Sequence, residues 1–156
     1  MLIAPVNFFL YDELKGKTMS EIMSKGKAII LMQIHNAEGE TMPGVGHWIA
    51  LLTGVDDRGD FIEHFDSYGI GMDKELALTH SEPLLKDLTK GHRVKQDKEK
   101  LQMVREEVNT CGRHCVSRCN LPLTYEEYVQ FLRTVQCPPD TAVTLMTINP
   151  LQLRKG

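Results

Sequence analysis

The sequence predicts an α+β fold, and three observations point to it. The chain has 156 residues, of which 42% are hydrophobic, and this suits one domain, residues 1–156, around a packed interior. Compact aliphatic and β-branched runs lie in the first half, whereas the last third carries helix-start signals. We therefore expect a short helix, a small and mainly antiparallel sheet, and then further helices.

The first expected elements are a short helix and a strand. Thr18 and Glu21 form a capping-box pattern, and Gly26 can end the helix that this pattern opens. Residues 27–34, KAIILMQI, form an aliphatic and β-branched run that predicts a strand. The glycines and the proline of residues 35–46 then predict an irregular loop.

Two further strands complete the expected meander. Residues 47–54, HWIALLTG, resume the apolar pattern, and residues 55–60, VDDRGD, have the composition of a turn. Residues 61–67, FIEHFDS, alternate as a third strand would. If the strands pair antiparallel, the start of the second lies beside the end of the third.

The rest of the chain is expected to be mainly helical. A short helix should start near Ser81, and residues 92–96, HRVKQ, could form an edge strand. Helix signals cover residues 109–120, and residues 124–127, TYEE, form a second capping box. Asp140 is expected to cap a last helix.

Composition excludes several classes of protein. The formal net charge of -3 gives no global reason to expect a nucleic-acid or membrane partner. Residues 1–17 are apolar, but Pro5, Asp12 and Glu13 argue against a secretory signal. No run approaches the ~18 apolar residues of a transmembrane helix. We expect a soluble intracellular protein whose cysteines stay reduced.

One segment, residues 86–105, is locally basic. It holds seven Lys or Arg residues, which are Lys86, Lys90, Arg93, Lys95, Lys98, Lys100 and Arg105. It also holds the acids Asp87, Asp97 and Glu99. The segment could make weak contact with nucleic acid, although the interspersed acids favour a solvated charged face.

Three cysteines lie close together in the sequence VNTCGRHCVSRC. Cys111, Cys115 and Cys119 are spaced at i, i+4 and i+8, so they form one stripe on a helix. The stripe spans about 12 Å, which is too long for one metal ion. Cys115 and Cys119 are expected to pack in the core. A zinc site that combines Cys111 and Cys115 with Cys137 and His114 stays an alternative.

Cys111 differs from the other two by its position. Asn109 and Thr110 are good N-cap residues, so the thiol would lie in the first turn of the helix. There the free N–H groups and the helix dipole stabilise a thiolate. Gly112 would leave room for a substrate backbone beside it. Cys111 is therefore the candidate nucleophile.

A nucleophilic cysteine needs a base and a group that orients the base. His47 opens the second predicted strand and Asp66 lies at the end of the third, so antiparallel pairing can make them neighbours. His64 and His114 are alternative bases, and the remaining histidines lie in a loop or in weakly predicted segments. The oxyanion would need donors, for which the Cys111 N–H and the Gln102 amide are candidates. A solvated surface role for Gln102 is the alternative.

The order of GHW, FDSYG, Gln102 and NTCGRHC resembles the adenovirus-proteinase-like family, whose relatives include proteases that cleave SUMO and other ubiquitin-like proteins. The maturation proteases of virophages and of Polinton or Maverick elements are similarly short and carry CGR at the nucleophile. The matching motifs run from His47 to about Arg118, which is roughly half of the chain.

The resemblance implies a cysteine endopeptidase that processes viral capsid precursors at glycine-containing sites, in the virion and in the cytoplasm of the infected host cell. It implies that His47 is the base, Asp66 its orienter, Gln102 an oxyanion donor and Cys111 the nucleophile. Trp48 would line a narrow cleft. The implied fold is a circularly rearranged papain-like fold in which the sheet faces the helix that carries the nucleophile. No metal or other cofactor is expected, although the adenovirus relative uses DNA as one.

The sequence departs from the family pattern in one place. Gln102 precedes Cys111 by nine residues, whereas the family glutamine usually precedes its cysteine by about six or seven. Either the run MVREEV holds a small insertion, or Asn109 supplies the amide instead. Two other functions stay open, namely a protease for ubiquitin-like modifiers and a zinc-stabilised binding domain.

Overall fold

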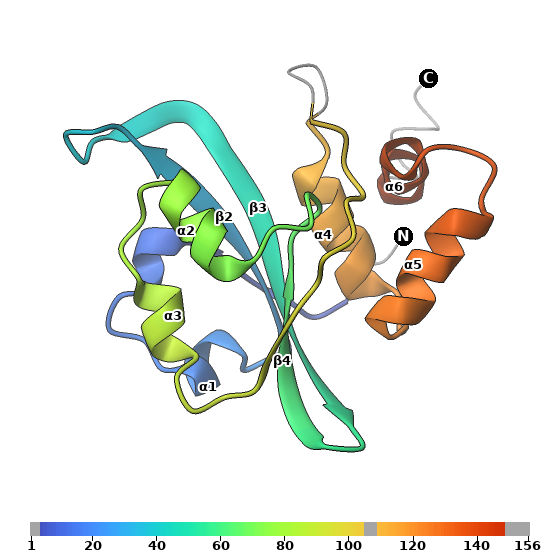
Figure 1. Cartoon of the computed structure of the whole chain (residues 1–156), viewed down its shortest axis with the longest axis horizontal. Coiled ribbons are helices and arrows are strands. Elements are labelled where there is room, and N and C mark those ends of the chain that lie inside the picture. Colours follow the sequence, from blue (N-terminus) through green and yellow to red (C-terminus); the bar gives the residue numbers. More distant parts are fainter. Residues whose placement is uncertain (1–3, 105–108, 149–156) are drawn as a thin grey trace.

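The chain folds as helices packed on both faces of one sheet (Figure 1). The computed structural model describes residues 4–104 and 109–148. The strands are β1 Asn7–Leu10, β2 Lys27–His35, β3 Thr41–Asp56, β4 Gly59–Phe65 and β5 Val94–Gln96. The helices are the 3-10 helix η1 Tyr11–Leu14 and α1 Met19–Ile22, α2 Met72–Leu78, α3 Leu84–Leu88, α4 Cys111–Asn120, α5 Tyr125–Thr134 and α6 Pro139–Thr147. The predicted α+β class is confirmed.

The five described strands form one sheet in the order β1-β2-β3-β4-β5. The central strands β2, β3 and β4 pair antiparallel, as the sequence predicts. Each edge strand, β1 and β5, instead runs parallel to its neighbour. Both edge connections contain helices, and a helical crossover returns the chain in the same direction. The sheet is therefore mixed, and the expectation of a mainly antiparallel sheet holds only for its centre.

The predicted loop at residues 35–46 is shorter than expected, because β2 ends at His35 and β3 already begins at Thr41, so only residues 36–40 form a loop. Gly46 lies in the sheet and not in the loop, because it pairs with Gln33 of β2. A Cβ at position 46 would lie 2.9 Å from Cδ1 of Leu31 and 3.2 Å from the carbonyl oxygen of Met32. The glycine thus allows close approach of two strands, which is another common use of glycine in sheets.

Side chains alternate between the two faces of the sheet. Ile30 and Leu51 pack with η1, α1, α2 and α3, whereas Ile29 and Ala50 pack with α4, α5 and α6. Cys115 and Cys119 of α4 are buried in the second of these cores, as expected. The α4 helix therefore lies against the sheet through its cysteine stripe.

Most predicted helix boundaries lie close to the observed ones. Capping boxes open α1 at Thr18 and α5 at Thr124, as predicted. The α3 helix begins at Leu84 rather than near Ser81, and α4 begins at Cys111, two residues after the predicted start. β5 is an edge strand, as expected.

The predicted cap of the last helix is wrong. Pro138 is the N-cap residue of α6, and Asp140 lies within the first turn. The carboxylate of Asp140 accepts hydrogen bonds from the α4 region instead.

No helix in the described ranges is long and apolar enough to span a membrane.

Candidate active site

His47, Asp66 and Cys111 come together at one end of the sheet. β4 ends at Phe65 opposite Ala50 of β3, so His47 lies beyond the end of β4 and Asp66 follows that strand directly. The Nε2 atom of His47 donates a hydrogen bond to Oδ1 of Asp66 at 3.0 Å. The two residues are neighbours across the ladder, as predicted, although His47 lies inside β3 and not at its start.

Cys111 is the first residue of α4 and is buried. The backbone N–H of Trp48 approaches its Sγ atom at 3.5 Å, and its thiol also hydrogen-bonds with the side chain of His47. Thr110 is the N-cap residue, but its hydroxyl does not cap the helix and donates to Asp140 instead. The first-turn position of the thiol therefore agrees with the sequence, and the expected side-chain cap does not.

The Cys111 and His47 side chains favour an ion pair. Burial raises the pKa of Cys111, but the hydrogen bonds from His47 and from the Trp48 N–H outweigh burial and lower it. Burial lowers the pKa of His47, but hydrogen bonds to Asp66 and Cys111 raise it to about 10. Both shifts favour a thiolate beside an imidazolium, which is the reactive form of a catalytic cysteine.

Asp66 fixes the orientation of the imidazole. Its Oδ1 atom accepts the His47 hydrogen bond and also the backbone N–H of Tyr68 at 2.7 Å. Burial raises the pKa of Asp66, but the hydrogen bonds from His47 and Glu75 hold it below its ordinary value. Asp66 is therefore an anion whose Oδ1 atom holds both the imidazole and the Tyr68 N–H.

Glu75 of α2 is a site residue that sequence reasoning missed. Its side chain is buried, with 3% of the residue exposed, and it hydrogen-bonds with Asp66. Burial and the neighbouring carboxylate of Asp66 raise the pKa of Glu75 to about 8. At neutral pH Glu75 is thus mainly protonated, and its carboxyl O–H donates a hydrogen bond to Asp66. Its position in the helix MDKELAL gives no sign of this contact, which depends on how α2 packs.

We predict that Glu75→Gln removes a pH dependence of stability. The pKa of Glu75 rises from an ordinary 4.5 to about 8 on folding, so its contribution is complete below about pH 4.5 and is lost as the pH rises towards about 8. Wild-type unfolding free energy should fall by up to about 1.4 kcal/mol per pH unit in that interval, relative to Glu75→Gln. Urea unfolding at about pH 5 and about pH 8 measures the difference.

The control for this prediction is Glu82→Gln, because Glu82 is exposed. It should keep the wild-type pH dependence. The prediction is wrong if the stability of Glu75→Gln changes with pH as the wild-type stability does.

Gln102 is buried next to the site, so its solvated alternative is wrong. Ser67 donates its hydroxyl to Oε1 of Gln102 at 2.6 Å, and Nε2 of Gln102 donates to the Tyr68 hydroxyl at 3.3 Å. The Tyr68 ring in turn stacks on His47, with ring centroids 4.8 Å apart. Tyr68 therefore links Gln102 to His47, a role that its place in the motif FDSYG does not indicate.

A cavity of about 430 Å³ lies beside the start of α4, and Trp48, Asn109 and Gly112 contribute to its wall. A Cβ at position 112 would lie 3.2 Å from Cδ1 of Trp48. The room that Gly112 was expected to leave for a substrate is therefore taken on this side by the indole ring. Asn109 is exposed at the same cavity.

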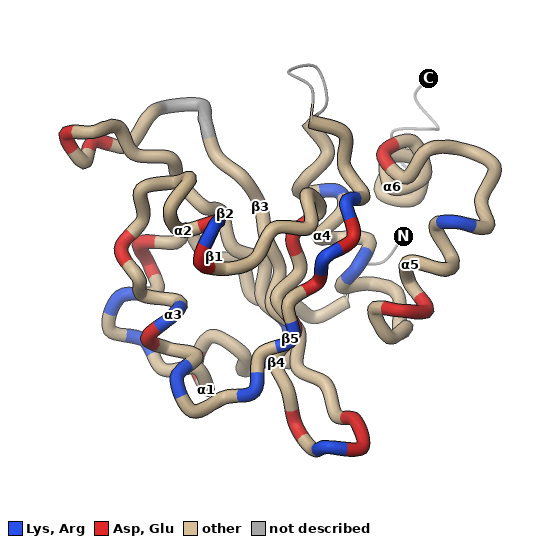
Figure 2. Tube along the Cα trace, in the orientation of Figure 1, with Lys and Arg blue, Asp and Glu red and all other residues tan. Residues whose placement is uncertain are grey.

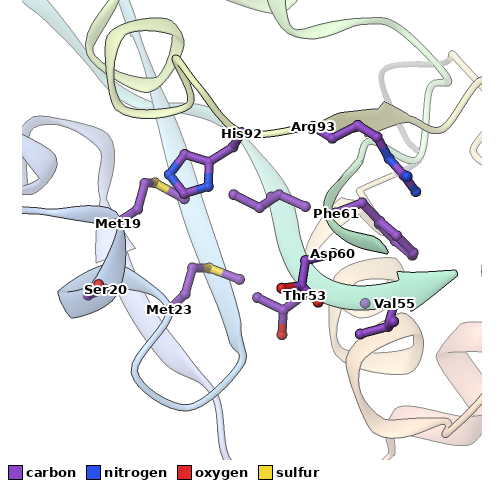
Figure 3. A pocket seen from close by; sticks show the side chains of 11 residues that line it. Met19, Ser20, Met23, Thr53, Val55, Asp60, Phe61, His92 and Arg93 are labelled. Atoms are coloured by element: carbon purple, nitrogen blue, oxygen red, sulfur yellow. The ribbon is translucent and has the colours of Figure 1, made fainter. Parts of the chain in front are cut away.

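A second cavity, of about 500 Å³, lies towards the other end of β3 (Figure 3). Met19 and Met23 line one side of it, and Phe61 lies on the other side (Figure 3). Its wall contains none of the residues that gather around Cys111. The cavity is therefore separate from the candidate active site.

The alternative bases do not take the place of His47. His64 is fully buried, and burial lowers its pKa to about 4, so it is neutral. His114 directs Nε2 to Oδ1 of Asp140 at 2.8 Å. His47 is the histidine whose hydrogen bond reaches Cys111.

The structure does not gather the cysteines around a metal site. All four cysteines are free. Across residues 4–104 and 109–148, the one group of side chains with donor atoms close enough to share an ion is His47, Asp66 and Glu75. The zinc set of Cys111, Cys115, Cys137 and His114 is therefore not formed. Hydrogen bonds already hold the three grouped side chains together.

Acidic residues interrupt the basic segment 86–105 (Figure 2). Lys86 pairs with Asp73 at 3.3 Å, and both Arg93 and Lys95 pair with Asp56. Arg105 lies outside the described residues. Several of the cations thus face carboxylates of the same chain, as expected of a solvated charged face.

The arrangement around Cys111 suits attack on a carbonyl carbon. It combines a thiol of lowered pKa, an imidazole that can carry and release a proton, an oriented carboxylate and a nearby N–H donor. No protein-family model matches this chain, and no curated protein or solved structure matches it.

Proposed function

We propose that the protein is a cysteine endopeptidase. The observation that carries this proposal is the buried hydrogen-bonded series Cys111–His47–Asp66, with the thiol at the first residue of α4. A nucleophile, its base and an orienting group in one series are the elements of catalytic triads on unrelated folds. The fold supports the proposal only in general terms, since a sheet packs against the helix that bears the nucleophile.

In the proposed reaction, the Cys111 thiolate attacks the carbonyl carbon of a peptide bond. The oxyanion that forms accepts hydrogen bonds from the Cys111 N–H and from the Gln102 amide. His47 gives its proton to the leaving amine, which departs and leaves a thioester on Cys111. Neutral His47 then takes a proton from water, and the hydroxide so formed hydrolyses the thioester. Asp66 keeps the imidazole oriented throughout.

For the biological role, we propose maturation of viral particles. The order of GHW, FDSYG, Gln102 and NTCGRHC supports a place among adenovirus-proteinase-like enzymes and a circularly rearranged papain-like fold. The substrates would be capsid precursor proteins cut at glycine-containing sites, in the virion or in the infected cell. Trp48, which lines the cavity beside α4, would contact the substrate. The basic segment 86–105 would at most contact nucleic acid weakly.

The test of this function is direct cleavage. Purified protein is incubated with the capsid precursor from the same genome, with Gly-Gly peptides, and with ubiquitin, SUMO and NEDD8 reporters. We expect cuts next to glycine in the precursor and in the peptides. Cleavage of a modifier reporter alone would replace the proposal by a protease for ubiquitin-like proteins. Absence of any cleavage by a folded protein would overturn the proposal.

We predict that Gln102→Ala lowers kcat by about 10²-fold or more with little change in KM, because an oxyanion donor acts mainly in the transition state. Steady-state kinetics on a peptide amide measures the two constants. Asn109→Ala is the matched variant, since Asn109 is the exposed amide nearest in sequence to Cys111. A larger loss in Asn109→Ala would assign the donor to Asn109.

A further inference from the structure

We propose that Asp140, in the first turn of α6, is a positioning residue that joins the Gln102 segment to the start of the nucleophile-bearing helix. The inference rests on the proposed function, since it concerns the oxyanion site of that reaction. Asp140 does not touch the reacting atoms. It acts on the residues next to those that do.

One carboxylate reaches both sides of the site. Oδ2 of Asp140 accepts the backbone N–H of Met103 at 3.0 Å, and Met103 directly follows Gln102. Oδ1 accepts the hydroxyl of Thr110 at 2.6 Å, and Thr110 directly precedes Cys111. The neighbours of the proposed oxyanion donor and of the nucleophile are therefore held by two oxygens of the same group.

A third contact extends this arrangement along α4. His114, which is fully buried, donates from Nε2 to Oδ1 of Asp140 at 2.8 Å. Thr110 directs its hydroxyl to Asp140 and not to the free N–H groups of its own helix. The side chains of Thr110 and His114, at the start of α4, thus both hydrogen-bond to Asp140.

Asp140 is charged in this setting. Burial raises its pKa, but the hydrogen bonds from Thr110, His114 and Met103 outweigh burial and lower it. Hydrogen bonds to an ionised acceptor are shorter and stronger than neutral ones. Each bond therefore limits the movement of the group that donates it.

These contacts account for the unusual spacing in the sequence. Nine positions separate Gln102 from Cys111, and part of that interval, residues 105–108, lies outside the described residues. Met103 and Thr110 lie on the two sides of this interval, and both bind Asp140. From the other direction, Ser67 holds Oε1 of Gln102. The amide can therefore keep its place although the sequence spacing is long.

The attachment of α6 does not depend on Asp140 alone. Ala142 and Val143 of α6 are buried in the same apolar core as Cys115 and Cys119 of α4. Removing the carboxylate should therefore loosen the segment around Met103 and Thr110 without detaching the helix. The effect on catalysis can then be measured in a folded protein.

The experiment compares Asp140→Ala and Asp140→Asn with wild type in four measurements: kcat and KM on a peptide amide, affinity for a peptide aldehyde, the rate of Cys111 alkylation by iodoacetamide, and thermal unfolding. The aldehyde forms an oxyanion on Cys111, whereas alkylation needs only the thiolate. For Asp140→Ala we expect kcat and aldehyde affinity to fall at least about 10-fold, with KM and alkylation within about threefold.

Asp140→Asn keeps an acceptor for Thr110 and His114 but presents an N–H group to Met103, so its kcat should lie between those of Asp140→Ala and wild type. This variant carries the test if Asp140→Ala does not fold. Thr141→Ala, an exposed neighbour on α6, is the control and should match wild type.

Unchanged kcat in folded Asp140→Ala, or an equal fall in kcat and alkylation rate, overturns the role of Asp140 while the protease stands. Failure of wild type to cleave any peptide or bind the aldehyde overturns the proposed function itself, and the role of Asp140 with it.

Discussion

Cys111→Ala is expected to abolish peptide hydrolysis, with a loss on the order of 10⁴-fold or more, because the variant has no nucleophile. The pKa of its thiol distinguishes Cys111 from the other two cysteines of α4. Hydrogen bonds from His47 and from the Trp48 N–H lower the pKa of Cys111. By contrast, burial raises the pKa of Cys115 well above its ordinary value and that of Cys119 to about 12.

The matched variants are Cys115→Ala and Cys119→Ala, which should keep the wild-type kcat because both thiols are protonated and buried in the core. Initial rates on one peptide amide compare all three variants. Alkylation with iodoacetamide near neutral pH, followed by peptide mapping, should modify Cys111 first. Full activity of Cys111→Ala, or loss of activity in Cys119→Ala with normal stability, would contradict the assignment.

The central pairing of the site could be predicted because each residue lies next to a boundary visible in the sequence. Cys111 follows cap residues, His47 lies on β3, and Asp66 directly follows β4, which a turn joins to β3. Antiparallel pairing then places the end of β4 beside the first half of β3, with the register set by the turn. Even the wrong start of β3 did not matter, because the turn between β3 and β4 sets which residues face each other.

Glu75 and Asp140 could not be predicted in the same way. Both lie in first turns of helices, where acids are common for local reasons, so the sequence offers a sufficient explanation without the site. Their actual contacts, with Asp66 and with Thr110, depend on how α2 and α6 pack on the sheet and on α4. Tertiary orientation of this kind leaves no periodic signal.

The fold shows the same division. The central strands and the capping boxes follow from local chemistry and are confirmed. β1 and α2 are not predicted, since β1 is a four-residue edge strand and α2 is short. The glycine at position 46 led to a wrong loop prediction, because Gly46 allows close approach of two strands and does not form a turn.

Arg118→Met is expected to lower the free energy of unfolding by about 3–5 kcal/mol. Arg118 of α4 donates from Nε and from its terminal guanidinium nitrogen to the two carboxylate oxygens of Glu63 on β4, at 2.8 and 2.7 Å. Both side chains are buried. Asp97 cannot replace the lost charge, because burial and Glu63 raise the pKa of Asp97 to about 10, so it is a neutral hydrogen-bond partner of Glu63. The variant would thus leave an unpaired carboxylate in the interior.

The control for this prediction is Arg133→Met. Arg133 pairs with Glu99 at 3.1 Å, but both side chains are about half exposed, so its loss should cost less than about 1 kcal/mol. Urea unfolding at neutral pH measures both variants, and a loss below about 1 kcal/mol in Arg118→Met would contradict the prediction.

The double variant Glu63→Gln/Arg118→Met separates charge compensation from positioning. It removes both charges, so its stability should recover part of the loss seen in Arg118→Met, and the two substitutions should be strongly non-additive. The ion pair also joins α4, which begins with Cys111, to β4, which leads to Asp66. Glutamine and methionine cannot reproduce this bidentate link. We therefore expect the double variant to regain stability but to keep a reduced kcat, whereas recovery of both would show that the pair serves stability alone.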